Sequence, residues 1–141
     1  MTNDKIIDGK IVSSEIRAKV KQFGDKLREK SGKTPGLAVV LVGENPASRV
    51  YVKNKIEKTE EVGFKSIEHK LDTEVSEEKL LEIVEMLNKD EDVQGILVQL
   101  PLPDHINSDK ILDSIKPEKD VDGFHAQNVG KLWSGLNSLV P

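Results

Sequence analysis

Residues 37–42 read Leu-Ala-Val-Val-Leu-Val, an apolar run with no polar interruption. A run of this length, rich in valine, is typical of a strand that is buried on both faces of a parallel sheet. Residues 95–100, Gly-Ile-Leu-Val-Gln-Leu, form a second run of similar character, and Pro101 follows it. The two runs predict the central strands of an α/β fold.

Segments with helical periodicity lie between the predicted strands. After the first run, Asn45 is a good N-cap, Pro46 suits the first helical position and Gly63 supplies a stop. Strands that alternate with helices at this spacing indicate right-handed βαβ units. The expected elements are helices over 12–30 (with Ser13 or Ser14 as N-cap), 46–62, 76–89, 109–115 and 128–132, and strands over 37–42, 64–71 and 95–100.

Length and composition set the class of protein. The chain has 141 residues, of which 36% are hydrophobic and 33% charged, without repeats or low-complexity runs. These values are sufficient for one domain with a substantial core. We therefore expect a single α/β domain with an open, mostly parallel sheet, flanked by helices on both faces in three layers.

The composition also excludes several classes of function. Lys and Arg total 21 against 25 for Asp and Glu, which disfavours a nucleic-acid-binding surface. The absence of cysteine excludes disulfides, thiolate catalysis and Cys-based metal sites. No apolar run approaches the roughly 20 residues of a membrane span. The N-terminal residues lack a signal-peptide pattern, so we expect a soluble, cytoplasmic protein. Neither G-x-G-x-x-G nor a P-loop occurs, so a self-contained nucleotide site is not supported.

Three polar side chains are the best candidates for chemistry. At about 100° per residue, Lys55 and Tyr51 fall on the inward arc of the second predicted helix, whereas Lys53 falls on the opposite side. Ser48 shares the inward arc. Helical side chains lean toward the helix N-terminus, and ligands of open α/β sheets bind beyond the carboxyl ends of strands, where Gln99 lies. A lysine, a tyrosine and a glutamine in one partly dry crevice would form a proton-transfer site.

Simpler interpretations of these residues stay open. Lys55 can extend past the core to reach water, and Tyr51 can pack in the core with its hydroxyl in water. Gln99 can satisfy a backbone group at the end of its strand. On helical geometry alone, the simpler interpretation of Lys55 is favoured.

The sequence Asp120-Val-Asp122-Gly123 is a further candidate, because it is similar to the start of an EF-hand loop. The third acidic ligand is absent and position twelve is Lys131 instead of Glu, so calcium is disfavoured. An Asp-Gly turn is the simpler interpretation. No pair among His69, His105 and His125 has helical metal-ligand spacing, so we expect surface or loop positions and no metal site.

Seven stretches in a fixed order carry a more specific pattern. They are Ile7-Asp-Gly-Lys10, Val42-Gly-Glu-Asn-Pro-Ala-Ser48, Tyr51-Val-Lys-Asn-Lys55, Gly95-Ile-Leu-Val-Gln-Leu-Pro-Leu-Pro103, Lys119-Asp-Val-Asp-Gly-Phe124, Asn128-Val-Gly-Lys-Leu132 and Leu139-Val-Pro141. Together they cover nearly the whole chain in order and closely resemble the bifunctional methylenetetrahydrofolate dehydrogenase/methenyltetrahydrofolate cyclohydrolase family. Each stretch alone is modest, but the combination is highly specific.

The resemblance implies an activity and a division of labour. Enzymes of this family oxidise methylenetetrahydrofolate with NADP and hydrolyse the methenyl product to formyltetrahydrofolate, in one-carbon metabolism and purine biosynthesis. Residues 1–141 would be the folate-binding catalytic domain, and the family's C-terminal Rossmann domain, which holds NADP, is absent from this chain. The resemblance implies a homodimeric parent enzyme. By itself, the chain is expected to be monomeric and weak or inactive as a dehydrogenase.

The resemblance also assigns roles to individual residues. Lys55 is similar to the lysine that handles proton transfer, and Tyr51 to the residue that stacks on the folate. Gln99 would hold the lysine by a hydrogen bond, and Asp122 would bind the pterin ring. Ser48 would help to position Lys55. The role of Asp122 is implied by the resemblance alone.

Two rival functions stay open. A non-catalytic folate-binding or regulatory α/β domain would keep Tyr51 and Asp122 for binding without turnover. The substrate domain of an amino-acid or shikimate dehydrogenase is a weaker alternative, because it is not expected to combine the proline-rich stretch after Gln99 with Asp122-Gly123.

Overall fold

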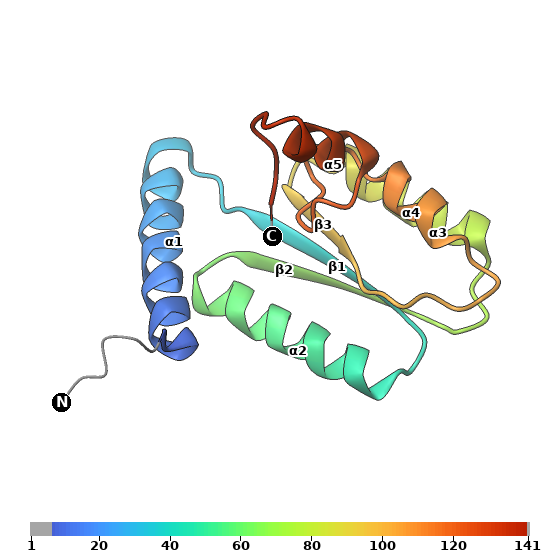
Figure 1. Ribbon diagram of the computed structural model, residues 1–141. Helices are drawn as coiled ribbons and strands as arrows, with labels where there is room; N and C mark the ends of the chain where they lie inside the picture. Colours follow the sequence, from blue (N-terminus) through green and yellow to red (C-terminus); the bar gives the residue numbers. More distant parts are fainter. Residues whose placement is uncertain (1–6, 141) are drawn as a thin grey trace.

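The computed structural model describes residues 7–140 (Figure 1). Three helices and three strands alternate along this part of the chain, and two further helices follow the last strand. No helix among these residues combines the length and the apolar character that a membrane span requires. The elements are α1 (Gly9–Ser31), β1 (Gly36–Val42), α2 (Pro46–Glu61), β2 (Lys65–Leu71), α3 (Glu77–Lys89), β3 (Gly95–Val98), α4 (Ser108–Ser114) and α5 (Ala126–Trp133).

The three strands form one parallel sheet in the order β2-β1-β3. β1 occupies the centre, with Gly36 opposite Lys65 on one side and Leu37 opposite Gly95 on the other. Its position explains its composition, because a central strand has both faces covered and no free edge. The open parallel α/β sheet predicted from the two apolar runs is confirmed.

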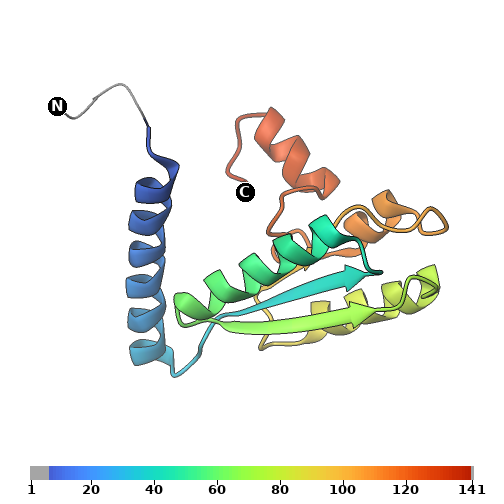
Figure 2. The ribbon, with the colours of Figure 1, turned by 90° about the horizontal axis from the view of Figure 1, so that it is seen from below.

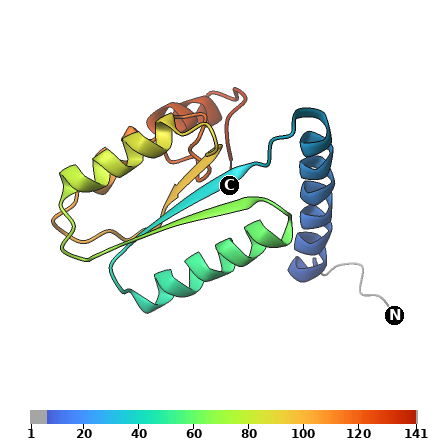
Figure 3. The ribbon, with the colours of Figure 1, turned by 180° about the vertical axis from the view of Figure 1, so that it is seen from behind.

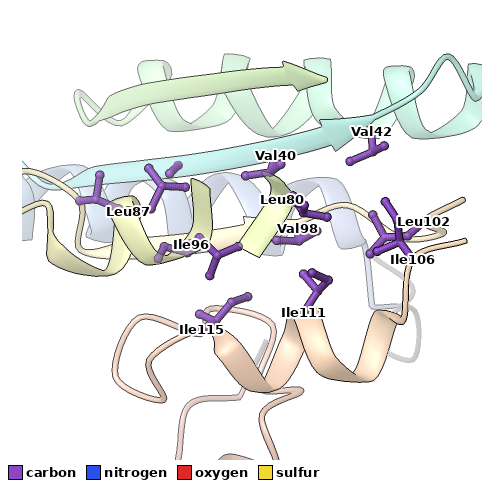
Figure 4. Close-up of a cluster of buried hydrophobic side chains, with 13 residues drawn as sticks. Val40, Val42, Leu80, Leu87, Ile96, Val98, Leu102, Ile106, Ile111 and Ile115 are labelled. Atoms are coloured by element: carbon purple, nitrogen blue, oxygen red, sulfur yellow. The ribbon is translucent and has the colours of Figure 1, made fainter. Parts of the chain in front are cut away.

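The elements form three layers (Figures 1 and 3). α2 covers one face of the sheet, and α3 and α4 cover the other. The α3–α4 face holds the larger core, in which the side chains of the sheet meet those of both helices (Figure 4). Its buried members are Ala38, Val40, Val42, Leu80, Val84, Leu87, Val93, Ile96, Val98, Leu102, Ile106, Ile111 and Ile115.

The α2 face carries a much smaller buried cluster. It consists of Val39, Leu41, Val52 and Leu97. These residues alternate along β1 with those of the larger core, as the period of a strand requires. Leu37, Ile56 and Val121, which pack against this cluster, are only partly buried.

The ends of several elements differ from the sequence predictions. β3 stops at Val98, two residues early, although the Gln99 N–H still donates to the Val40 carbonyl at 2.9 Å. The peptide bond between Leu100 and Pro101 is cis. β2 begins at Lys65. α5 begins at Ala126, earlier than predicted, because His125 serves as its N-cap, and it ends at Trp133, one residue later than predicted.

The start of α1 was predicted wrongly. The carboxylate of Asp8 is the N-cap and accepts a hydrogen bond from the Lys10 N–H at 2.8 Å. Asp is among the strongest capping residues, and neither Gly9 nor Lys10 prevents the helix from starting there. Ser13 and Ser14, the expected caps, consequently lie inside the helix.

The apolar stripe of α1 predicted the helix correctly, but most of the stripe is exposed. Phe23, for example, has 70% of its surface exposed. Arg17 forms an ion pair with Glu61 of α2, and Arg28 donates to the Gly63 carbonyl at 2.9 Å. α1 therefore stands at one end of the sheet instead of lying on a face (Figure 2).

The histidines are placed differently from one another. His105 is in a loop, where its Nε2 lies 2.8 Å from the Val75 carbonyl oxygen. His69 lies half-buried on β2, which corrects the prediction of a surface or loop position. The reason is strand alternation, because His69 points to the same face as Ile67 and Leu71, which pack on the larger core.

Candidate functional site

α2 carries the first half of the candidate site. Its N-cap is Asn45, whose side chain accepts a hydrogen bond from the Ser48 N–H at 3.1 Å, and Pro46 fills the first turn. The residues buried against the sheet are Ser48, Val52 and Thr59. Lys55 lies beside this buried strip and is half-buried. The helix thus fixes the stem of Lys55 on its sheet side and leaves the amine near the carboxyl end of β3.

Gln99 meets Lys55 at the end of β3. The Lys55 Nζ donates to the Gln99 Oε1 at 3.2 Å. The Gln99 Nε2 donates to the Leu100 carbonyl at 2.8 Å, which satisfies a backbone group as the simpler interpretation of this residue suggested. Because the amide nitrogen is engaged there, the amide oxygen faces the lysine. One side chain therefore makes both contacts, and the structure brings Lys55 and Gln99 together.

Asp122 lies in the loop after α4, close to the lysine. Its turn is closed by the Gly123 N–H, which donates to the Asp120 carbonyl at 3.2 Å, and Gly123 has a φ of +66° that suits glycine. Burial raises the pKa of the Asp122 carboxyl above its ordinary value. The positive charge of Lys55 opposes this rise in pKa, and the negative charge of Asp120 adds to it.

A cavity of about 550 Å³ adjoins these side chains. Lys55 and Asp122 are at its wall, and its other walls are predominantly apolar. The apolar lining includes Leu37, Val62, Phe64, Leu97 and Val121. Besides Lys55, the basic side chains of Arg17 and Lys58 also line it. A cavity with a largely apolar wall, a few basic groups and one carboxyl fits a small, partly aromatic ligand that carries polar groups.

Tyr51 and Ser48 occupy opposite environments. Tyr51 has 61% of its surface exposed, so the interpretation as a core tyrosine is wrong. On a helical wheel it lies about 80° from the centre of the buried strip, too far round α2 to reach the sheet. Its ring is available to a flat ligand at the rim of the site. Ser48, with 4% exposed, is packed beneath the first turns of α2.

Sequence reasoning named Asp120 only as part of the Asp120-Val-Asp122-Gly123 motif, and it assigned no role to Asn128. Asp120 and Asn128 are 1% and 3% exposed, and the Asn128 Nδ2 donates to the Asp120 Oδ2 at 3.0 Å. An aspartate and an asparagine eight positions apart across a loop carry no local signal. The only sequence feature that drew attention to this loop was the pair of acidic residues, Asp120 and Asp122, before Gly123.

The β1–α2 turn does not fit the pyrophosphate of a dinucleotide. A pyrophosphate site needs several free backbone N–H groups in a glycine-rich turn at a helix N-terminus. In the β1–α2 turn, Pro46 has no N–H, the Ser48 N–H is taken by Asn45, and the carboxylate of Glu44 is exposed beside Arg49. Among residues 7–140, no group of three potential ligands lies close enough together to hold a metal ion.

Comparison with known proteins gives a consistent family. The family model described as "Tetrahydrofolate dehydrogenase/cyclohydrolase, catalytic domain" matches residues 7–122. Bifunctional protein FolD 1 of Roseobacter denitrificans is 57% identical over 136 residues, which are 96% of this chain and 45% of that protein. Bifunctional protein FolD of Streptococcus gordonii is 51% identical over 137 residues, which are 97% of this chain and 48% of that protein. The chain thus spans about half the length of these relatives.

Solved structures agree with the sequence matches. The bifunctional FolD methylenetetrahydrofolate dehydrogenase/cyclohydrolase of Campylobacter jejuni superimposes with a TM-score of 0.91 at 50% identity, over 94% of this chain and 47% of that one. The corresponding enzyme of Trypanosoma brucei, solved with its NADP cofactor and an inhibitor, gives a TM-score of 0.91 at 34% identity, over 96% of this chain and 46% of that one.

Proposed function

The chain belongs to the tetrahydrofolate dehydrogenase/cyclohydrolase family, and from this premise we propose that it forms the folate-binding catalytic domain of a bifunctional enzyme. That enzyme oxidises 5,10-methylenetetrahydrofolate to the methenyl form with NADP and hydrolyses the methenyl form to 10-formyltetrahydrofolate. Because the β1–α2 turn does not fit the pyrophosphate of a dinucleotide, we infer that NADP would be held by another part of the enzyme. The family resemblance also favours a cytoplasmic, homodimeric enzyme.

The observation that carries the proposal is the hydrogen bond to Gln99 from Lys55, a residue that lines the cavity. The neutral amide oxygen of Gln99 holds the amine of Lys55 in one position without forming an ion pair with it. An amine held in this way can accept a proton from a bound substrate and return it from the same position. The half-buried Asp122 beside it supports a ligand with N–H donors, as in the pterin ring.

The hydrolysis follows from these groups. A water molecule attacks the methenyl carbon, and the amine of Lys55 takes the proton that the water loses. The carbon–nitrogen bond of the five-membered ring then breaks, and the lysine returns a proton to the departing nitrogen. Gln99 keeps the amine oriented, Asp122 binds the pterin, and the exposed ring of Tyr51 stacks on the folate. Ser48 supports the turn of α2 that precedes Lys55.

A matched pair of lysine variants tests the proposal. Lys55→Met removes the amine at the cavity, whereas Lys53→Met removes a lysine two positions away that faces solvent beside Glu57. The 141-residue chain is mixed with 5,10-methenyltetrahydrofolate, and the loss of methenyl absorbance is compared with that in buffer. We expect the original chain and Lys53→Met to exceed the buffer rate. Lys55→Met should lose roughly 100-fold or more of that excess rate or fall to the buffer rate.

Calorimetric titration with 5-formyltetrahydrofolate, a stable folate, completes the test. Equal hydrolysis by the two variants would contradict the role of Lys55. Folate binding without hydrolysis by any of the three proteins would indicate the non-catalytic folate-binding domain instead. Neither binding nor hydrolysis would contradict the proposed folate site.

A further inference from the structure

The loop between α4 and α5 contains a fully buried carboxylate. Asp120 is 1% exposed, and its Oδ2 accepts hydrogen bonds from the His125 N–H at 2.8 Å and from the Asn128 Nδ2 at 3.0 Å. Within residues 7–140, no ion pair involves this carboxylate. A buried aspartate is costly unless its oxygens accept hydrogen bonds, and here two neutral donors from the start of α5 bind Oδ2.

The side chain of Asp120 contacts α5, whereas its backbone pairs with β3. It forms a parallel bridge with Ile96, whose N–H donates to the Lys119 carbonyl at 2.7 Å. The Asp120 carbonyl also accepts from the Gly123 N–H and closes the turn that contains Asp122. Asp120 therefore joins β3, the turn and α5 at one point, two residues before Asp122.

Asn128 secures the same loop a second time. Its Nδ2 donates to the Pro117 carbonyl at 2.8 Å as well as to Asp120. The Ser138 Oγ donates to the Asn128 carbonyl at 2.8 Å, which fixes α5 from its other side. Both ends of the segment 117–120 are thus held by one buried amide.

We propose that Asp120 and Asn128 form a clamp that positions Asp122 beside Lys55, and that this clamp sets the affinity of the site for its folate ligand. The two residues do not line the cavity and are positioning residues. The choice of folate as the ligand rests on the proposed function. The placement of Asp122 by the clamp is independent of that function, and the titration of Asp122 measures it without any ligand.

Asp113 offers a matched control for the clamp. Its Oδ1 accepts a hydrogen bond from the Ala126 N–H at 3.2 Å, so it also binds the first turn of α5 through a carboxylate. Asp113 is exposed and belongs to α4, away from the turn of Asp122. Asp120→Asn and Asp113→Asn therefore remove the same charge from the same helix end, but only the first changes the clamp.

The first readout is ligand affinity, measured by calorimetry with 5-formyltetrahydrofolate on the 141-residue chain. We expect Asp120→Asn to raise the Kd roughly tenfold, the equivalent of one charge-assisted hydrogen bond. Asp113→Asn should change the Kd by no more than roughly twofold. Asn128→Ala, which keeps the charge of Asp120 but removes its amide donor, should also weaken binding.

The second readout is the titration of Asp122, followed by the NMR shift of its carboxyl carbon. The charged groups that act on it are Lys55 from α2 and Asp120 from its own loop. Arg17 and Lys58 line the same cavity, and both pair with Glu61. Asp120→Asn should lower the pKa of Asp122, because a nearby negative charge is lost and the turn is released toward water. Asp113→Asn should leave that pKa unchanged.

The outcomes separate the two proposals. If Asp120→Asn is folded but matches the original chain in both Kd and Asp122 titration, the clamp is refuted. If Asp120→Asn does not fold, Asn128→Ala decides by the same two readouts. If the original chain binds no folate, the proposed function fails, and the Asp122 titration alone decides whether the clamp places this carboxyl.

Discussion

The two faces of the sheet share the same strands but are packed in opposite ways. On the α3–α4 face the side chains form one continuous core without a charged member (Figure 4). On the α2 face a cluster of four buried residues adjoins an open cavity of about 550 Å³, with Lys55 and Asp122 at its wall. The difference indicates that one face supplies most of the stability. The other face is less densely packed, and polar groups line its cavity, as the proposed folate site requires.

The largest expected effect comes from truncating the same residue type on each face. Leu80→Ala, on α3, removes a side chain with 0% exposure from the closed core and should cost about 2–5 kcal/mol of unfolding free energy. Leu97→Ala, on β3, removes a side chain with 5% exposure that lines the cavity. It should cost less, about 2 kcal/mol or below, because the space joins a cavity already open to solvent. Urea denaturation of both variants measures the difference.

The contrast between the two faces is contradicted if the two variants rank in the opposite order of unfolding free energy. A cost for Leu97→Ala equal to or greater than that for Leu80→Ala would mean that the α2 face is as closed in solution as the α3–α4 face. The cavity would then be filled by repacked side chains, and the site would need another location.

Asp122→Asn is expected to change the stability of the fold by a smaller amount and in the opposite direction, as a gain. Burial raises the pKa of Asp122 in the folded protein above its unfolded value. Between these two pKa values the folded state binds more protons than the unfolded state, so stability falls as pH rises through this window. Above the window the carboxylate destabilises the fold. Asp122→Asn should therefore raise the Tm at pH 7 and change it less at pH 3, where the carboxyl is protonated in both states.

Thermal unfolding at the two pH values checks this prediction. Asp109→Asn, on the exposed first turn of α4, is a control for the loss of one negative charge at the surface. A lower Tm for Asp122→Asn at pH 7 would mean that the attraction between Lys55 and Asp122 outweighs the burial of the carboxylate. The carboxylate would then stabilise the fold instead of being held at a cost for binding.

The fold was largely predictable because its signals are local. The apolar run of β1 and the Asn45-Pro46 start of α2 are written in consecutive residues, and both were placed correctly. The environment of α1 was not predictable. Its stripe has the right period, but whether a stripe is covered depends on elements far along the chain. Phe23 has the helical spacing of this stripe and is nevertheless 70% exposed.

The site was predictable only in part. Helical geometry and the end of a parallel strand were enough to bring Lys55 toward Gln99. The same geometry placed Tyr51 too far inward, because the buried strip of α2 is centred on Val52 and Thr59. Asp122 could not be placed from local patterns, because its position depends on a loop that returns to pair with β3.

We propose that the open α2 face binds folate through the groups around Lys55. An NMR titration of the 15N-labelled 141-residue chain with 5-formyltetrahydrofolate tests this binding directly. We predict saturable shifts of the amides at and next to Tyr51, Lys55, Gln99 and Asp122, with little change at Leu80 and Ile111 in the closed core. Saturable shifts centred on the α3–α4 face, or no saturable shifts at all, would contradict the account.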